Sequence, residues 1–487
     1  MNALWHRRMF RSVCLKSGCL ILVSALSLST LVEASEYKVF HQFPKGYGFT
    51  PTTTGILVQG QDGNIYGTTP NGGRDDCGVA FSITPQGQYA EFAGFCDNPN
   101  AAFLAHPSGG LMLGSDGAFY GFSGGQYPAY LFKLKNSHLY VAGYFKDEET
   151  LSTGAPVEGV DGSLYGLATG FSNGYYDYVY GFTPGSGLYL VKKLGAAGHD
   201  AQSPLLIGWD GNQYGPTYYG AAQEGGVHGQ GRLFSITIDG MYQQLNGLYD
   251  FTHKPTSGRL PNGPLIRGLD GNLYGTAQDG GSAERGVVFM LEPGNSARVK
   301  RIYSFKGTGD GSTPFSGMVL GSNGVFYGTT ASGGDSKASC GTLFSLTPNS
   351  PAAPTAYTFA VEHVFQGGAA NDGCNPKSPP MLHTNGRIYG LIAGQDQALI
   401  YSLDVGAPQT VTVLPQAAKI GQSVTILGQG LNSTTAVAFG GIAATSFKVV
   451  SRTLVKATVP AGAATGVVTV TTSRGTVSSP TSFPIVP

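Results

Sequence analysis

One short motif recurs along this 487-residue chain and constrains its fold more than any other feature. Its first copy is Gly60-Gln61-Asp62-Gly63-Asn64-Ile65-Tyr66-Gly67. Six further copies centre on Asp116-Gly117, Asp161-Gly162, Asp210-Gly211, Asp270-Gly271, Asn323-Gly324 and Asn385-Gly386. The Tyr-Gly pairs that follow lie roughly fifty residues apart and begin at Tyr66, Tyr120, Tyr165, Tyr214, Tyr274, Tyr327 and Tyr389. A period of this length indicates a tandem array of one supersecondary unit.

Each unit is predicted to contain four short antiparallel strands. Asp-Gly or Asn-Gly between apolar runs favours a two-residue type I′ hairpin turn, because these residues tolerate positive φ. In the fifth unit, residues 265–268 enter this turn and residues 273–276 leave it. Two more β-rich runs follow at residues 286–291 and 299–305. Four strands at this period are typical of a β-propeller blade.

The two ends of the repeat region complement each other. Residues 37–43 resemble the fourth strands of later units but precede any first strand. The seventh unit has the opposite defect, because it ends at Leu403 without a fourth strand. We therefore predict that residues 37–43 complete the last blade, so that residues 35–405 form a closed seven-bladed β-propeller. Closure removes free sheet edges within the ring.

The N-terminal residues have the composition of an export signal. A basic segment precedes the apolar run Cys19 to Leu26, and small residues reach Ala34 before Ser35. Residues 1–34 are therefore predicted to be a cleaved signal peptide, with a secreted protein that is periplasmic, extracellular or on the cell surface of a bacterium. No later stretch is apolar enough to insert into a membrane. With 29 basic and 29 acidic residues overall, the chain gives no indication of a nucleic-acid partner.

The predicted ring has two unlike faces. The Asp-Gly turns form one face, whereas long loops at 69–78, 216–231 and 366–379 lie on the other, where functional residues are expected. Of the four cysteines outside the signal, Cys77 and Cys340 come just before a third strand, and Cys96 and Cys374 come just after a fourth strand, on the same face. Their equivalent positions in units one and six predict the disulfides Cys77–Cys96 and Cys340–Cys374, consistent with export.

The motif and its continuation resemble a known family. The pattern G-x-D-G-N-x-Y-G-T-T, with the later run Gly78 to Pro85 and its counterpart Gly341 to Pro348, is similar to the GloVer tandem repeat of exported bacterial proteins. This resemblance covers roughly residues 37–405 and implies architecture without implying a chemistry. Residues 408–487 resemble an IPT/TIG domain, and their β-branched runs between Gly-rich turns indicate an immunoglobulin-like β-sandwich.

The sequence contains no convincing catalytic, metal or cofactor motif. Two G-x-S-x-G matches, around Ser123 and Ser172, lack the strand-turn-helix context of a nucleophile elbow. The histidines lack zinc-type spacing, and the recurring Asp residues are explained by turn chemistry. We therefore predict neither a metal site nor a cofactor.

Two function classes remain open. The favoured hypothesis is an exported, non-enzymatic binding or adhesion protein whose loop face contacts a glycan or another surface polymer. The alternative is an extracellular propeller lyase or hydrolase, which needs titratable groups converging in a pocket. Stacking candidates are tyrosines predicted to lie in loops after second strands, namely Tyr175, Tyr176, Tyr218 and Tyr219. The oligomeric state and the identity of the ligand do not follow from the sequence.

Overall fold

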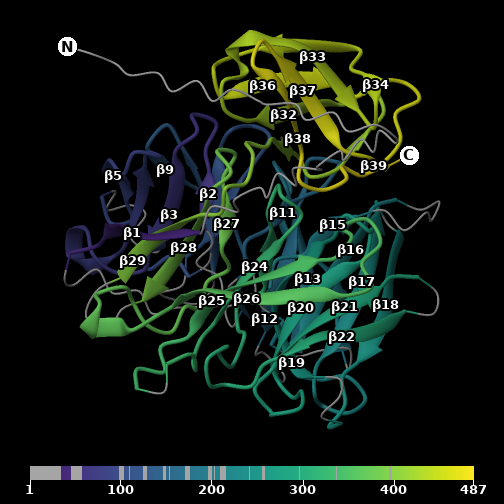
Figure 1. Ribbon diagram of the computed structural model, residues 1–487. Helices are drawn as coiled ribbons and strands as arrows, with labels where there is room; N and C mark the ends of the chain where they lie inside the picture. Colours follow the sequence, from purple (N-terminus) through teal and green to yellow (C-terminus); the bar gives the residue numbers. More distant parts are fainter. Residues whose placement is uncertain are drawn as a thin grey trace, which may run out of the picture. The chain divides into compact units, whose positions relative to one another are not determined.

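The chain forms β-sheets almost throughout (Figure 1). The computed structural model describes residues 35–44, 57–97, 104–108, 110–123, 129–145, 150–152, 154–170, 176–195, 200–201, 203–208, 215–240, 242–254, 258–294, 297–335, 337–393 and 398–486. The predicted signal peptide lies outside the described residues. Short 3₁₀ turns are found at η1 (Arg74–Asp76), η4 (Gly367–Ala369) and η5 (Leu431–Ser433). The predicted all-β class is confirmed.

The repeat region folds into successive antiparallel sheets. Sheet one contains β2 (Val58–Gln59), β3 (Ile65–Thr69), β4 (Val79–Ile83) and β5 (Tyr89–Gly94). Sheet two contains β6 (Met112–Leu113), β7 (Phe119–Phe122), β8 (Tyr130–Lys135) and β9 (His138–Tyr144). Sheet three contains β10 (Thr150–Leu151), β11 (Val157–Glu158), β12 (Leu164–Gly170), β13 (Tyr176–Thr183) and β14 (Gly187–Lys193). Sheet four contains β15 (Leu206–Gly208), β16 (Thr217–Ala222), β17 (Arg232–Asp239) and β18 (Tyr242–Asp250).

The remaining sheets of the repeat region follow the same order. Sheet five contains β19 (Arg259–Arg267), β20 (Leu273–Asp279), β21 (Val287–Glu292) and β22 (Arg298–Ser304). Sheet six contains β23 (Met318–Leu320), β24 (Phe326–Thr330), β25 (Thr342–Pro348) and β26 (Tyr357–Val364). Sheet seven contains β27 (Met381–Leu382), β28 (Ile388–Ala393), β29 (Ala398–Asp404) and β1 (Glu36–Gln42). The described residues before 405 thus contain seven sheets, and each inner strand comes from the start of its repeat.

The N-terminal strand completes sheet seven, as the sequence predicts. β1 pairs antiparallel with β29, from Glu36 opposite Asp404 to Gln42 opposite Leu399. A register shift between Val39 and His41 matches the shift found between the third and fourth strands of the other sheets. Because β1 carries the same irregularity, it occupies a genuine fourth-strand position.

Hydrophobic cores fill the space between neighbouring sheets. One cluster joins sheets one and two, and further clusters join each following pair in turn. A last cluster joins sheet seven to sheet one through Tyr389, Ile400, Phe43 and Phe81. Sheet packing therefore continues across the point where the chain of repeats begins and ends.

The recurrent turn differs from the predicted type I′ turn. In the first copy, the Gly63 N–H donates to Gly60 O, the Gly60 N–H donates to Asn64 O, and only Gly63 has positive φ, at 83°. This is a type I turn followed by a left-handed glycine, which closes a longer hairpin loop. The prediction was wrong because the aspartate is needed for its side chain rather than for positive φ.

That side chain ties the turn to the Tyr-Gly tyrosine of the same repeat, which we call the repeat tyrosine. Asp62 Oδ1 accepts the Asn64 N–H at 3.0 Å, and Asp62 Oδ2 accepts the Tyr66 hydroxyl at 2.9 Å. The same tyrosine-to-aspartate bond is present at Tyr120, Tyr165 and Tyr274. The asparagines of units six and seven instead donate to Tyr327 and Tyr389. The motif is therefore a structural device that fixes the hairpin to its second strand.

The fourth unit departs from the predicted register. Tyr219 pairs with Leu206, as Tyr66 pairs with Val58, and a Cβ on Gly220 would meet Phe234 as one on Gly67 would meet Phe81. Tyr219 therefore occupies the repeat position, whereas the predicted turn and Tyr214 lie outside the described residues. Pro216 separates the two Tyr-Gly pairs and cannot donate to a sheet ladder, so the second strand begins after it.

The C-terminal residues form the predicted sandwich. One sheet contains β30 (Thr412–Leu414), β32 (Ser423–Leu427), β36 (Leu454–Thr458) and β35 (Ser446–Val449). The other contains β34 (Ile442–Ala443), β33 (Thr434–Phe439), β37 (Val468–Thr472) and β38 (Gly475–Ser478). β31 (Ala418–Lys419) pairs with β39 (Ile485–Val486) in parallel. The core between the two sheets buries Ile426, Val437, Val455 and Val470.

Candidate functional site

Both predicted disulfides are present. Cys77 bonds to Cys96 in unit one, and Cys340 bonds to Cys374 in unit six. Each bond joins the connection before a third strand to the connection after a fourth strand. The disulfides therefore pin the longer loops, on the face of the ring opposite the Asp-Gly turns, which we call the loop face.

The buried acids on the loop face accept hydrogen bonds from backbone N–H groups. Asp310 accepts the N–H groups of Lys306 and Gly307, and also the Tyr303 hydroxyl at 2.8 Å. Asp372 of the next repeat accepts two N–H groups in the same way, at Gln366 and Gly367. Carboxylates used like this order their own loops.

The acid Asp372 also holds an imidazole. His363 Nε2 lies 2.8 Å from Asp372 Oδ2, and the Tyr37 ring stacks on His363 with 3.6 Å between ring centroids. Tyr37 in turn donates to Asp372 O. Burial raises the pKa of Tyr37 far above its ordinary value. This cluster docks β1 against sheet six and commits its histidine to a structural contact.

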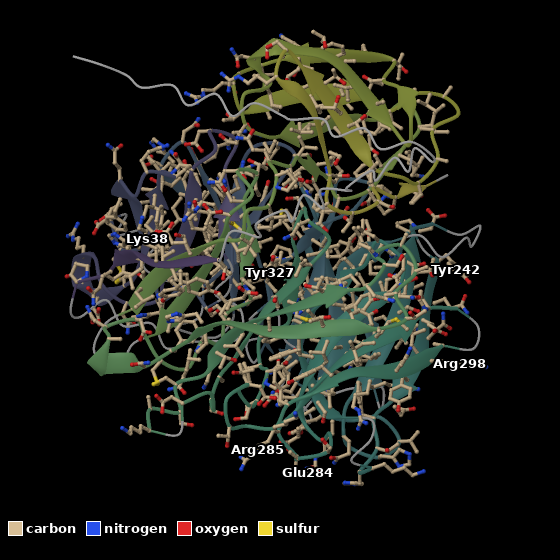
Figure 2. All side chains as sticks on the ribbon, viewed as in Figure 1. Lys38, Tyr242, Glu284, Arg285, Arg298 and Tyr327 are labelled. Carbon is tan, nitrogen blue, oxygen red and sulfur yellow. A yellow bond between two sulfur atoms is a disulfide. The ribbon has the colours of Figure 1, made fainter. Side chains whose placement is uncertain are left out.

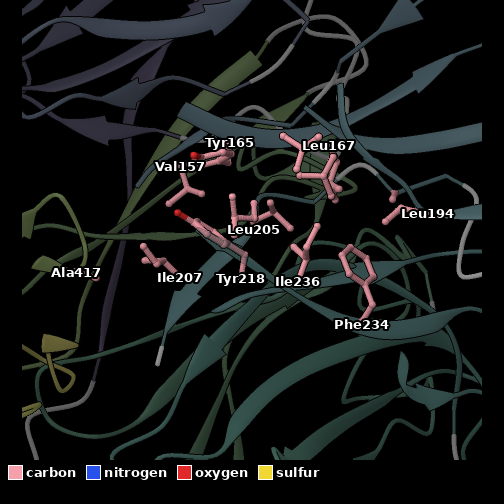
Figure 3. Packing of buried hydrophobic residues seen from close by; sticks show 14 of the residues in the cluster. Val157, Tyr165, Leu167, Leu194, Leu205, Ile207, Tyr218, Phe234, Ile236 and Ala417 are labelled. Atoms are coloured by element: carbon pink, nitrogen blue, oxygen red, sulfur yellow. The ribbon is translucent and has the colours of Figure 1, made fainter. Parts of the chain in front are cut away.

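The predicted stacking tyrosines do not form an exposed group. Tyr218 and Tyr219 lie on β16 rather than in a loop, and their side chains are 1% and 2% exposed. Figure 3 shows Tyr218 within the core between sheets three and four, beside Tyr165 and Ile236. The expectation of loop positions was wrong, because the repeat register in unit four starts five residues later than predicted.

The other two candidates have different outcomes. Tyr176 begins β13 and is half-buried, with Lys193 Nζ 3.9 Å from its ring centroid. Tyr175 lies outside the described residues. Of the four predicted stacking tyrosines, only Tyr176 is both described and partly exposed, and the Lys193 cation already lies over its ring.

Exposed aromatic side chains gather instead on outer strands. Tyr140 and Tyr144 of β9 are 53% and 52% exposed, Tyr189 of β14 is 40% exposed, and Tyr242 of β18 is 36% exposed. In the described repeat region these four are the exposed tyrosines and phenylalanines. β9 contacts β14, and β14 contacts β18. Figure 2 shows Tyr242 at the margin of the ribbon. We call these four residues the outer tyrosines.

Polar side chains lie beside Tyr242 on β18. The Tyr242 hydroxyl donates to Gln244 Oε1, and Gln244 Nε2 donates to Asn246 Oδ1 at 3.2 Å. These three side chains alternate along β18 and share its exposed face. Lys192 is exposed on β14. The arrangement offers flat apolar rings next to hydrogen-bonding amides, which suits amphipathic ligands.

The sandwich covers the turn face of the ring. Thr453 Oγ1 donates to Gln61 O, Gln429 Nε2 donates to Thr384 Oγ1, and Gln422 Nε2 donates to Val160 O. Each of these ring residues directly precedes the turn Asp or Asn of its repeat. Ala417 belongs to the same cluster of buried residues as the core between sheets three and four. The C-terminal domain therefore contacts one repeated position in several sheets.

A collar of seven apolar residues lies beneath this cover. Each member pairs with the repeat tyrosine of its own sheet. The collar residues are Val58, Met112, Val157, Leu206, Ile266, Val319 and Met381. They line two adjoining cavities of about 350 Å³ and 230 Å³, both also lined by Thr412 and Gln416 of the sandwich. The sequence carries a signal for the collar: an apolar residue lies four positions before the turn Asp or Asn of each repeat.

Polar groups are few in these cavities. Glu158 lines the smaller one, where burial raises its pKa, but it accepts the Ser115 N–H and hydroxyl. Gln59 is 7% exposed, and its Oε1 accepts the Thr384 N–H at 2.9 Å. Arg267 lines the larger cavity, and its Nη1 donates to Gly271 O at 3.2 Å.

A buried histidine marks the junction of sheets seven and one. His383 Nε2 lies 2.9 Å from Gly63 O, and His383 Nδ1 accepts the Asn385 N–H at 3.1 Å. The neutral Nε2–H tautomer satisfies both contacts. Burial lowers the pKa of His383, although the hydrogen bond to Gly63 O opposes that shift. This histidine is therefore a neutral structural link between two repeats.

Neither a metal cluster nor a spanning helix is found in the described part of the chain. No group of three or more His, Cys, Asp or Glu side chains is arranged to hold a metal ion there. In the same residues, no helix has the length and apolar character needed to cross a membrane.

Comparisons with known families agree with the architecture. The model of the Gloeobacter/Verrucomicrobia repeat matches residues 152–401, and that of the IPT/TIG domain matches residues 408–485. The comparison with curated proteins gave no match.

Several solved structures are similar to the chain at low identity. A putative oxidoreductase (glucose dehydrogenase) from Thermus thermophilus is 14% identical, with a TM-score of 0.38, covering 60% of this chain and 95% of that one. An alpha-L-arabinanase from Penicillium chrysogenum is 13% identical, with a TM-score of 0.36, covering 61% and 92%. The calcium-binding protein regucalcin from Agrobacterium tumefaciens is 12% identical, with a TM-score of 0.35, covering 67% and 96%.

Proposed function

Because the chain belongs to the Gloeobacter/Verrucomicrobia repeat family and carries a C-terminal IPT/TIG domain, we propose that it is an exported, non-enzymatic binding protein for a glycan or another surface polymer. Its two disulfides are typical of proteins that fold outside the reducing cytoplasm. The proposed contact surface is the set of outer tyrosines rather than the loop tyrosines expected from the sequence.

The gathering of the outer tyrosines on three consecutive outer strands carries this proposal. Tyrosines that serve only to fill the cores between sheets are expected to be buried, as Tyr274 and Tyr389 are. The outer tyrosines instead retain between 36% and 53% exposure on β9, β14 and β18. Tyrosine rings stack on the apolar faces of sugars, and their hydroxyls bond to sugar oxygens.

The use of the buried acids favours binding over hydrolysis. Asp310 and Asp372 accept backbone N–H groups, and Asp177 accepts the Ala201 N–H and the Thr169 hydroxyl. Glycosidic-bond hydrolysis generally needs two carboxyl groups that flank the substrate with separated pKa values. These three acids are instead committed to loop structure.

The test is binding to a panel of soluble and insoluble bacterial polysaccharides by affinity electrophoresis and pull-down. A Tyr140→Ala/Tyr144→Ala/Tyr189→Ala variant should lose about tenfold or more in affinity at an unchanged melting temperature. The matched control is Phe447→Ala, which removes an exposed aromatic ring from β35 of the sandwich and should leave binding intact. Unchanged binding by the triple variant, or no binding by the folded wild type to any polymer, would overturn the proposal.

A further inference from the structure

The collar cavities combine an apolar wall with hydrogen-bond donors that have no acceptor. Gln59 Nε2 and Arg267 Nη2 are both buried without a hydrogen-bond partner among the described residues. Gln59 lines the smaller cavity and Arg267 the larger one. A buried donor left unpaired is energetically unfavourable, and more so when it is charged. Such donors therefore mark places where an acceptor is expected.

The charge balance in the cavities is asymmetric. Glu158, the acid that lines the smaller cavity, already accepts two hydrogen bonds from Ser115. The cation, Arg267, bonds to one backbone oxygen and lies 5.9 Å from the Tyr219 ring centroid. No salt bridge involves Arg267 among the described residues. Among the residues that the structure describes, the unsatisfied charge is therefore positive, and a complementary ligand is an anion.

The cavity size suits a small molecule. Cavities of about 150 Å³ lined by aliphatic and aromatic residues bind benzene, and ligand pockets typically begin at about 300 Å³. The larger cavity measures about 350 Å³ and is walled by Leu206, Ile266, Val319 and Met381. Gln416 is exposed and lines both cavities, so solvent reaches them at that residue.

From this geometry we propose that the collar cavities, closed on one side by the sandwich, bind an apolar carboxylate whose head group accepts from Arg267. The alkyl or aryl part packs on the collar, and a chain long enough to pass Met381 and Thr412 enters the smaller cavity. A carbonyl or ether oxygen there accepts from Gln59 Nε2. This site is separate from the outer tyrosines and involves no bond-making step.

Sodium decanoate is the probe, titrated into the full chain by calorimetry below its micellar concentration, with 1-decanol as the uncharged counterpart. The wild type should bind one decanoate. Arg267→Met keeps much of the length of the side chain and removes its charge, so it should weaken decanoate binding about tenfold or more and leave 1-decanol binding unchanged. Equal decanoate affinity in the folded Arg267→Met variant, or no decanoate binding by the folded wild type, would overturn the proposal.

A second variant tests the location. Val319→Trp places a large ring in the wall of the larger cavity and should abolish binding of both probes. The matched control is Leu269→Trp, since Leu269 is exposed on the neighbouring turn and does not line either cavity. Binding that persists in a folded Val319→Trp variant would show that decanoate sits elsewhere and would equally overturn the proposal.

Discussion

Removing the Phe43 ring should destabilise the junction at which the ring of sheets closes. Phe43 follows β1, is 0% exposed, and packs between sheets seven and one with Leu57, Tyr389 and Ile400. Its ring lies 5.1 Å from that of Phe81, edge to face. Truncating a fully buried phenylalanine to alanine typically costs about 3–5 kcal/mol, from lost transfer energy and the cavity left behind. We expect Phe43→Ala to lower the free energy of unfolding of the repeat region by this amount.

The assay is equilibrium unfolding in guanidinium chloride. Residues 408–487 contain neither tyrosine nor tryptophan, so the near-UV circular dichroism of these residue types reports on the repeat region and not on the sandwich. Phe447→Ala removes a 39% exposed ring and should change stability by no more than about 0.5 kcal/mol. A loss below about 1 kcal/mol in Phe43→Ala would refute the reasoning, because it would show that the junction of sheets seven and one contributes less than a buried phenylalanine should.

Three further predictions follow from hydrogen bonds and a disulfide. Burial lowers the pKa of His383 in the folded protein, so the unfolded chain takes up a proton first as the pH falls below 6.5. The melting temperature should therefore drop from pH 7 toward about pH 5. His383→Gln should show a smaller drop, because it lacks the titrating ring. Asp270→Ala should lower the free energy of unfolding in urea by about 1–3 kcal/mol, because the Tyr274 hydroxyl loses its carboxylate partner. Asp270→Asn introduces the residue type of units six and seven and should lower the free energy of unfolding by less than half of that amount. Cys340→Ser should lower stability by about 2–4 kcal/mol by opening a loop with a sequence separation of 34, and non-reducing peptide mapping of the wild type should recover the Cys340–Cys374 pair.

The repeat pattern was enough to predict the sheets because it encodes local structure. The turn residues, the Tyr-Gly pair and the apolar runs recur in each unit, and hairpin pairing depends on such neighbours. Unit four shows the limit of this reasoning. Two Tyr-Gly pairs, at Tyr214 and Tyr219, match the sequence pattern of the second strand. The second strand begins after Pro216, because proline cannot donate to a sheet ladder, and this places Tyr219 at the repeat position.

The outer tyrosines could not be predicted from alternation. In each sheet a register shift interrupts the pairing of the third and fourth strands, and in sheet two it falls between Leu131 and Phe132. β9 is the outer strand of its sheet, so that Tyr140 and Val141 are both exposed although they are consecutive. The collar cavities depended on a different long-range event, the docking of the sandwich, which no pattern within a single repeat encodes.

The pairing of β1 with β29 also constrains the order in which the parts of the ring fold. β1 is among the first segments of the ring to be synthesised, yet its partner, residues 398–404, arrives only after every intervening repeat. Such non-local pairing raises contact order and slows folding, because loop-closure entropy is lost before the contact forms. Until then β1 presents an unpaired backbone edge of the kind that promotes aggregation. Completion of the ring is therefore a late step, which can follow only after the whole repeat region has been delivered.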